Sequence, residues 1–265
     1  MTDAREAELR ERLASVRARL ERAASDAGRD VADIELLPVT KFFPAHDVAA
    51  LFRLGATAFA ESRDQEAAAK IAEVDRLIGG HAVRWHMVGR IQRNKARSVA
   101  GWAYAAHSVD SAKVVAALDR GAVEALDGGR RAEPLRVYVQ VSLDGDESRG
   151  GVDVAASARI DELCAAVDAA AGLAFVGLMA IPPLGADPGE AFARLQRERD
   201  RLQQNCQQPL GLSAGMSGDL EAAVRHGSTC VRVGTALMGP RPLTSPEVVT
   251  PVTPSSQAPP EGSSQ

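Results

Sequence analysis

The feature that most constrains the fold of this chain is a regular alternation of short apolar segments with longer helical ones. Eight segments have the length and composition of β-strands, and helical stretches separate them. The strands are expected at residues 34–40, 57–60, 83–88, 104–109, 135–143, 173–181, 211–213 and 230–233. This alternation predicts parallel strands joined by right-handed crossovers, and eight such units favour a closed (β/α)8 barrel of the TIM type, an α/β fold.

An open, doubly wound sheet is the alternative fold. It would carry a glycine-rich fingerprint directly after the first strand, and the residues at that place, Thr40-Lys41-Phe42-Phe43-Pro44, contain no glycine. The helices between the strands are expected over residues 44–55, 63–77, 94–99, 111–126, 154–171, 188–206 and 219–226. The sequence therefore favours the barrel.

The two ends of the chain differ from this pattern. Apolar residues recur at helical spacing near the start, at Leu9, Leu13, Val16 and Leu20. They predict an amphipathic helix over 3–27, with Thr2 as its N-cap and Gly28 after its last turn. Residues 243–265 are rich in Pro, Ser and Thr and predict a disordered tail. The barrel with its leading helix is thus expected to occupy 1–242.

Composition narrows the possible functions. The formal net charge of −4 argues against a general nucleic-acid binder, so an anion site has to be local. The three cysteines, Cys164, Cys206 and Cys230, have no C-x-x-C spacing and suit a reducing compartment. The histidines lack metal-ligand spacing, and no apolar run is long enough to span a membrane. We therefore expect a cytoplasmic protein with no metal, nucleic-acid or membrane partner.

Two segments near the end of the chain predict a phosphate site. The strand at 230–233 runs into Gly234 and Thr235, and Ser217-Gly218 precedes a short helix. Such turns expose backbone N–H groups and hydroxyls that favour an anion. On a barrel they fall in the loops after the seventh and eighth strands, where phosphate sites are common. Ordinary helix capping is the alternative for Ser217-Gly218.

Lys41 and Arg232 are the candidates for chemistry beside that phosphate. Lys41 shares one side of the first strand with Leu37 and Val39, so it would emerge at the barrel mouth if that side faces inward. A partly desolvated amine can form a Schiff base, and a lysine facing a phosphate suggests pyridoxal phosphate (PLP). Arg232 can only donate, and beside a pyridine nitrogen it would keep that nitrogen unprotonated and weaken the electron sink. The alternatives are a solvated lysine and an arginine that closes the barrel end through an ion pair.

Three further features are expected near the same mouth. His86 could contact a ligand ring or act as a general base, although a hydrogen-bonded core histidine is the preferred interpretation. Met179 is expected to pack under whatever occupies the mouth. The polar, glycine-rich stretch 144–151 follows the fifth strand, at a place where mobile lids are common in barrels.

Five motifs occur in order along the chain. They are Val39-Thr40-Lys41, Trp85-His86-Met87-Val88-Gly89 with Gln92 and Asn94-Lys95, Gly177-Leu178-Met179-Ala180-Ile181-Pro182, Met216-Ser217-Gly218-Asp219 and Val231-Arg232-Val233-Gly234-Thr235. Together they resemble the YggS/PROSC-type pyridoxal phosphate homeostasis proteins, from the first helix to about Arg241. The resemblance implies a single-domain barrel like the N-terminal domain of alanine racemase and of bacterial-type ornithine decarboxylase.

The resemblance also implies roles for single residues. Lys41 would hold PLP as an internal aldimine, Ser217, Gly234 and Thr235 would hold its phosphate, and Arg232 would approach the pyridine nitrogen. One motif departs from the family pattern, because Ala60-Glu61-Ser62-Arg63 stands where Gly-Glu-Asn and an aromatic residue are usual. Ser62 could supply a shorter hydrogen bond there, and Arg63 could add a cation.

The resemblance implies a protein that binds and delivers or buffers the vitamin B6 cofactor, with PLP-dependent apo-enzymes as possible partners and no efficient turnover. Arg232 at the ring nitrogen and the lack of a predicted second domain fit that role. One alternative is a slow racemase that acts through Lys41, with His86 or a partner residue as the opposing base. Another is a barrel for a different phosphorylated metabolite, with an aldolase lysine. We expect a monomer, because the leading helix covers the barrel and no second apolar face stands out.

Overall fold

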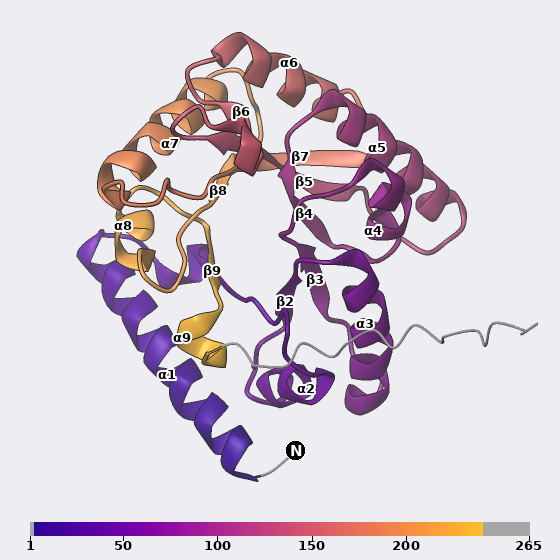
Figure 1. The fold of residues 1–265 in the computed structure, drawn as a ribbon, viewed down its shortest axis with the longest axis vertical. Helices are drawn as coiled ribbons and strands as arrows, with labels where there is room; N and C mark the ends of the chain where they lie inside the picture. The colour runs from indigo at the N-terminus through magenta and orange to yellow at the C-terminus, as the bar shows by residue number, and fades with distance from the viewer. Residues whose placement is uncertain (1–2, 241–265) are drawn as a thin grey trace, which may run out of the picture.

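A ring of parallel strands with helices around it forms the core of the computed structural model, which describes residues 3–240 (Figure 1). The barrel strands are β1 (Glu35–Pro38), β2 (Ala58–Glu61), β3 (Arg84–Met87), β4 (Ala105–Val109), β5 (Leu135–Ser142), β7 (Leu173–Met179), β8 (Gly211–Ser213) and β9 (Cys230–Val233). Each lies within two residues of a predicted strand at both ends.

The strand order closes the sheet on itself. It runs β1–β9–β8–β7–β5–β4–β3–β2, with parallel pairing throughout. Val39 forms a parallel bridge with Ala60, and the Thr40 N–H donates to the Ala60 carbonyl, which joins the two ends of this order. An open sheet would leave β1 and β2 as separate edges. The predicted (β/α)8 barrel is therefore confirmed.

The helices follow the predicted alternation. They are α1 (Asp3–Asp26), α2 (Ala45–Arg53), α3 (Asp64–Ile78), α4 (Ala96–Trp102), α5 (Ala112–Asp127), α6 (Ser157–Asp168), α7 (Pro188–Gln203), α8 (Leu220–Arg225) and α9 (Thr235–Met238). Short 3₁₀ turns occupy Val31–Asp33, Arg93–Lys95 and Glu147–Arg149. Within residues 3–240, no helix is both long and apolar enough to cross a membrane.

Two short elements were not predicted. The strand β6 (Val152–Asp153) pairs with β5, so α6 begins at Ser157 rather than at 154 as expected. The helix α9 has only four residues, too few to give a periodic signal. The predicted N-cap Thr2 and the predicted tail 243–265 lie outside the described residues.

Helix α1 lies along the outside of the barrel beside α8 and α9 (Figure 1). Its apolar side chains are buried as predicted, at Leu9, Leu13, Val16 and Leu20. Arg5 forms an ion pair of 2.7 Å with the buried Asp47 and donates to the Met238 carbonyl at 3.0 Å. The first helix is therefore fixed both to α2 and to the last turn of the barrel.

Strand alternation separates an outer and an inner layer of side chains. Phe59, Trp85 and Val231 pack outward with the buried face of α1. On the other side of the strands, Leu37, Ala58, Ala60 and Cys230 form a small cluster, with Val39 and Val88 packed against it. Because Leu37 and Val39 face the interior, the strand does direct its Lys41 side inward, as expected.

Two motif glycines allow neighbouring segments to approach closely. A Cβ placed on Gly177, which has a φ of 147°, would lie 1.9 Å from the Gly211 carbonyl oxygen. A Cβ on Gly89 would lie 2.0 Å from the Ser62 carbonyl oxygen. No side chain fits at either place, so these glycines set the spacing between segments that end at the barrel mouth.

Candidate functional site

The predicted site residues gather at the carboxyl ends of the barrel strands. Lys41 follows β1, Ser62 follows β2, Met179 ends β7, Ser217 and Gly218 follow β8, and Gly234 and Thr235 follow β9. In a parallel barrel these ends form one face, which is where barrel enzymes place their active sites. Arg232 and His86 lie lower, within β9 and β3.

Lys41 is half-buried and begins a turn of unusual backbone conformation. The next residue, Phe42, has a φ of 71°, the one positive φ of a non-glycine residue within 3–240. Such a conformation costs about 1 kcal/mol or more and persists where the surroundings impose it. The Phe42 ring centre lies 5.8 Å from Lys41 Nζ and 5.7 Å from Arg63 Cζ. A strained turn therefore presents the lysine.

A buried ion pair between Glu61 and Lys70 holds the residue that precedes this turn, Thr40, in place. Glu61 Oε1 accepts hydrogen bonds from Thr40 Oγ1 at 2.7 Å and Lys70 Nζ at 2.6 Å, and Lys70 also donates to the Thr40 carbonyl at 2.9 Å. Glu61 is fully buried, and burial raises its pKa while Lys70 opposes the rise. The Oε2 atom of Glu61 has no hydrogen-bond partner in the described part of the chain. Lys70 had no role in the sequence analysis, since nothing in the spacing of α3 marks it.

The two loops predicted to hold a phosphate contact each other. Ser217 Oγ accepts a hydrogen bond from the Ala236 N–H at 3.1 Å, which leaves its own proton available to a ligand. Arg19 donates to the Ser217 carbonyl at 3.1 Å and so fixes this loop to α1. A Cβ on Gly218 would meet nothing within 4 Å, and one on Gly234 only Val39 at 3.8 Å. The structure therefore places Ser217 beside the Gly234–Thr235 turn with open space around the glycines.

Arg232 is buried and makes three hydrogen bonds to uncharged oxygens. One terminal nitrogen donates to the carbonyl and to Oγ of Ser213, both at 2.6 Å, and the other donates to the Ala180 carbonyl at 2.9 Å. Burial lowers the pKa of Arg232, but an arginine stays protonated in proteins. Within residues 3–240, these partners differ from the ion pair that would close a barrel end.

Behind Arg232, hydrogen bonds connect Ser213 to two histidines. His107 Nδ1 lies 2.7 Å from Ser213 Oγ, and His86 Nδ1 lies 2.9 Å from His107 Nε2. Both imidazoles are buried, which lowers the pKa of His86 to about 3 and that of His107 well below its usual value. The preferred interpretation of His86 as a hydrogen-bonded core residue is confirmed, and a neutral imidazole of such low basicity is a poor general base.

His107 and Ser213 were not predicted from the sequence as functional residues. His107 stands with Ser108 in the buried strand 105–109 and Ser213 ends the strand 211–213, and a polar residue in a strand of mostly small or apolar residues is the signal that could have found them. Met179, which is 1% exposed, pairs in register with Ser213 and with Gln140, so it packs in the same layer. The expectation that it packs beneath the mouth agrees with this position.

The polar loop after β5 is organised by its own ion pairs. Arg149 pairs with Asp144 at 2.6 Å and with Asp146 at 3.3 Å, and a 3₁₀ turn covers Glu147–Arg149. The chain then returns to β5 through β6. The role of a mobile lid stays a prediction for this loop.

The chain is similar to a known protein family over most of its length. The family model described as alanine racemase, N-terminal domain, matches residues 12–242. The pyridoxal phosphate homeostasis protein of Mycobacterium tuberculosis is 62% identical over 248 residues, which cover 91% of this chain and 96% of that protein. The protein of the same name from Escherichia coli is 34% identical over 241 residues, covering 86% and 95%. The chain belongs to the pyridoxal phosphate homeostasis protein family.

Solved structures agree with membership in this family. PipY of Synechococcus elongatus, solved with PLP bound, has a TM-score of 0.72 and 34% identity, and the match covers 87% of this chain and all of that one. Alanine racemase from Streptomyces coelicolor has a TM-score of 0.66 at 20% identity and covers 88% of this chain and 58% of its own. This second likeness shows the shared barrel alone, which the homeostasis proteins have in common with the racemases.

Proposed function

We propose that this chain binds PLP covalently at Lys41 and takes part in the homeostasis and delivery of the vitamin B6 cofactor. The Lys41 amine condenses with the PLP aldehyde, so a C=N bond forms and water leaves. One observation carries the proposal. The half-buried Lys41, on a strained turn, lies on the same face of the barrel as the two contacting loops that contain Ser217 and Thr235, and there is open space beside the glycines of those loops. The PLP bound to the relative PipY supports it.

The residues present fit each part of the cofactor. Ser217, Gly218, Gly234 and Thr235 would hold the phosphate, because a hydroxyl proton and uncrowded glycine backbone are available there. Arg232 would face the ring nitrogen as a donor. Ser62, His86 and Met179 are proposed to line the site more distantly, with His86 acting through its neighbours because it is buried beneath them.

The geometry favours a carrier over an efficient racemase. PLP supplies an electron sink when its ring nitrogen is protonated, and a donor such as Arg232 holds that nitrogen unprotonated. A racemase also needs a second base, and His86 is 2% exposed with a pKa of about 3. Following D-isomer formation from single L-amino acids with the PLP-loaded protein tests this, because substantial turnover would contradict the carrier function.

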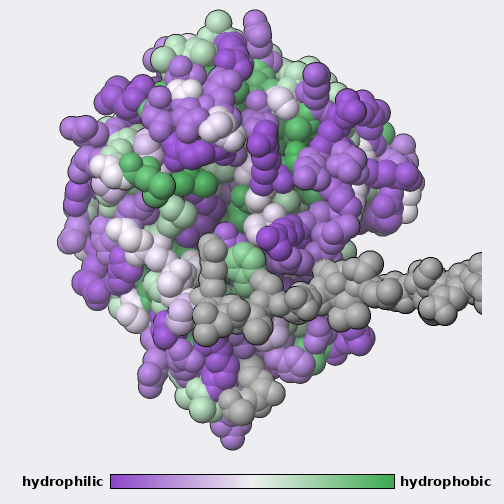
Figure 2. Space-filling model, viewed as in Figure 1, coloured by the Kyte–Doolittle hydropathy of each residue, from purple (hydrophilic) through white to green (hydrophobic). Residues whose placement is uncertain are grey.

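We further propose that the protein acts as a cytoplasmic monomer that passes PLP to apo-enzymes. Burial of the apolar face of α1 supports a monomer, and Figure 2 shows polar residues over most of the surface in that view, with apolar residues in smaller patches. The cysteines Cys164, Cys206 and Cys230 are free thiols, which supports a reducing compartment. Light scattering of the loaded protein and PLP transfer to an apo-enzyme would test these points.

Borohydride trapping tests the proposed linkage. PLP is incubated with the protein, the C=N bond is reduced, and the pyridoxyl group is located by peptide mass spectrometry. We expect the label on Lys41, its loss in Lys41→Ala, and full labelling of Lys41 in Lys113→Ala, a matched change at an exposed lysine of α5. A Lys41→Ala protein that traps PLP as completely as the parent would show that another lysine carries it.

A further inference from the structure

We propose that Ser213, His107 and His86 are positioning residues that hold Arg232 in place as a donor at the barrel mouth, with the Glu35 carboxylate as the negative charge nearest the far end of their hydrogen-bond chain. The inference rests on the proposed function, because Arg232 is assigned to the PLP ring nitrogen there. It gives a role to Ser213, His107 and Glu35, which the proposed cofactor site leaves unused, and a more specific role to His86.

The hydrogen-bond chain crosses the interior of the barrel, and its residues belong to five strands. Arg232 on β9 contacts Ser213 on β8, Ser213 contacts His107 on β4, and His107 contacts His86 on β3, over distances of 2.6, 2.7 and 2.9 Å. His86 Nε2 lies 3.8 Å from Oε2 of Glu35, the first residue of β1, which is too long for a hydrogen bond, and it has no hydrogen-bond partner within residues 3–240. The hydrogen bonds thus run from the carboxyl ends of the strands towards their amino ends.

The partners fix the direction in which the protons point. Arg232 must donate to Ser213 Oγ, so the Ser213 proton is free to go to His107 Nδ1. His107 Nε2–H then donates to His86 Nδ1, which leaves the proton of His86 on Nε2, the atom that lies 3.8 Å from the Glu35 carboxylate. The reverse order would place two N–H groups on Ser213 Oγ and turn the bare Nε2 of His86 towards a carboxylate. All the donors therefore point away from Arg232 and towards Glu35.

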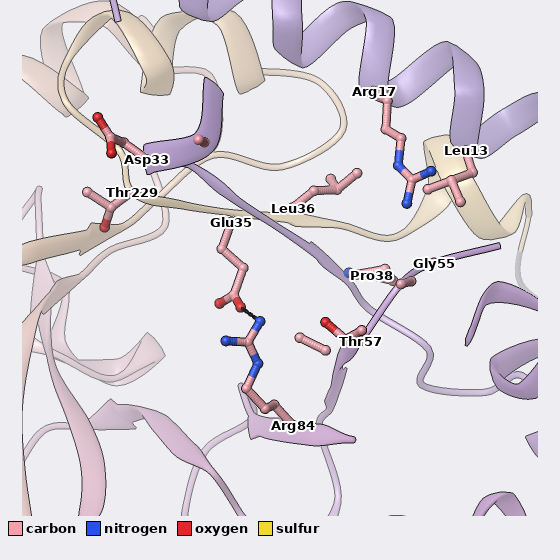
Figure 3. A pocket seen from close by; sticks show the side chains of 13 residues that line it. Leu13, Arg17, Asp33, Glu35, Leu36, Pro38, Gly55, Thr57, Arg84 and Thr229 are labelled. Atoms are coloured by element: carbon pink, nitrogen blue, oxygen red, sulfur yellow. Dashed lines mark hydrogen bonds and ion pairs between the residues drawn. The ribbon is translucent and has the colours of Figure 1, made fainter. Parts of the chain in front are cut away.

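Glu35 places a negative charge near the far end of the hydrogen-bond chain. Arg84 donates to Glu35 Oε1 at 2.8 Å, which favours the ionised carboxylate against the rise in pKa that burial causes. Both residues line a cavity of about 400 Å³ at the amino ends of the strands, under α1. Figure 3 shows Glu35 and Arg84 pointing towards each other there, below Arg17 and Leu13 of the helix. Glu35, at the far end of the hydrogen-bond chain, thus borders a cavity, while the two imidazoles are buried.

The hydrogen-bond chain matters because no carboxylate within residues 3–240 forms a hydrogen bond with Arg232, although Asp219 acts on its charge. Its guanidinium is held by the Ser213 and Ala180 oxygens, and Ser213 Oγ is the one side-chain atom among them. A hydroxyl whose proton goes to His107 keeps its lone pairs for the arginine, and the buried Cys230 thiol is a further side-chain neighbour of Ser213. Fixing the hydroxyl therefore fixes the arginine.

The proton direction can be tested without cofactor. Long-range ¹H–¹⁵N NMR of the histidine rings in the PLP-free protein should show both imidazoles neutral, with the proton on Nε2 and Nδ1 bare. The Ser213→Ala variant should shift the Nδ1 resonance of His107, since its donor is gone. Protons on Nδ1, or imidazolium rings at neutral pH, would overturn the proposed chain. This measurement on the parent protein does not depend on the folding of any variant.

The effect on Arg232 is tested with PLP carrying ¹⁵N in its ring. Ser213→Ala should move the ring-nitrogen resonance and weaken PLP binding about fivefold, because Arg232 loses one of its three hydrogen bonds, and Ser213→Thr should restore both. Ser228→Ala is the matched control, because Ser228 is equally buried and its hydroxyl contacts only backbone carbonyls among the described residues.

The outcomes separate the two proposals. If Ser213→Ala leaves both the ring-nitrogen resonance and the affinity at parent values, or if Ser228→Ala changes them equally, the positioning role is wrong. If the parent protein fails to trap PLP at Lys41, the proposed function fails instead, and the histidine NMR still decides whether the chain exists.

Discussion

Lys70 and Glu61 form an ion pair directly behind the turn that carries Lys41, with Nζ 2.6 Å from Oε1 and the carboxylate fully buried. Lys70→Met would leave that carboxylate without its cation. Removing one partner of a buried pair costs about 3 kcal/mol, because a charge then stays buried and uncompensated. We expect this loss of unfolding free energy in urea denaturation, whereas Lys113→Met on the exposed face of α5 should change it by less than about 0.5 kcal/mol.

The Glu61–Lys70 pair also predicts that the stability lost in Lys70→Met depends on pH. Burial raises the pKa of Glu61 above its usual 4.5 and Lys70 lowers it, so losing Lys70 raises the pKa further. A carboxyl with a raised folded pKa destabilises the protein as pH rises from the unfolded value through the folded one. The deficit of Lys70→Met should therefore be smaller at about pH 5 than at about pH 8. A deficit that does not change with pH would mean that Lys70 acts by packing alone.

The buried histidines predict that the free energy of unfolding rises with pH, which is the opposite of the effect of Glu61. The pKa of His86 falls from 6.5 to about 3 because burial disfavours the imidazolium, and that of His107 is also lowered. Below pH 6.5 the unfolded chain binds protons at these imidazoles and the folded protein does not. The free energy of unfolding therefore falls as the pH drops, by up to about 1.4 kcal/mol per pH unit for each imidazole.

Comparing variants isolates this effect from that of Glu61. A His86→Gln/His107→Gln protein should lose much of the slope between about pH 6 and pH 4 in urea denaturation. His46→Asn, at a half-exposed side chain of α2, should keep the parent slope. Equal slopes in the double variant and the parent would mean that the imidazoles take up protons in the folded state.

The alternation of strands and helices was predictable because it depends on local patterns. Segments such as 211–213 and 230–233 match the observed strands to the residue, and closure of the barrel followed from counting them. The placement of Lys41, Ser217 and Thr235 on one face was also predictable, since the carboxyl ends of parallel strands meet there.

The interior connections were not predictable, because they join residues far apart in the sequence. His107 and Ser213 are separated by 106 positions and meet only because β4 and β8 face each other across the closed barrel. The Glu61–Lys70 pair depends on which side of β2 faces α3. The four-residue helix α9 and the two-residue strand β6 are shorter than any period that a pattern could reveal.

Close backbone approach predicts a sharp contrast between glycines. A Cβ on Gly177 would overlap the Gly211 carbonyl at 1.9 Å, so Gly177→Ala should cost about 3 kcal/mol or prevent folding. Gly101, inside α4, has Arg130 Nη1 as its nearest neighbour at 3.4 Å, a flexible side chain that can move. Gly101→Ala should therefore leave thermal stability unchanged or raise it by up to about 0.5 kcal/mol. Equal losses at both positions would contradict this interpretation.

The exposed hydroxyl of Thr235 offers the narrowest test of the phosphate position. Thr235 begins α9 beside Ser217, whose Oγ accepts the Ala236 N–H, so both hydroxyls lie at one turn. If the cofactor phosphate binds there, Thr235→Ala removes one charge-assisted hydrogen bond and should weaken PLP binding by about 1 to 2 kcal/mol, while Thr235→Ser keeps the hydroxyl and most of the affinity. Equilibrium dialysis with PLP measures the difference. Unchanged affinity in Thr235→Ala would place the phosphate away from this turn, and equal losses in Ala and Ser variants would assign the effect to the methyl group.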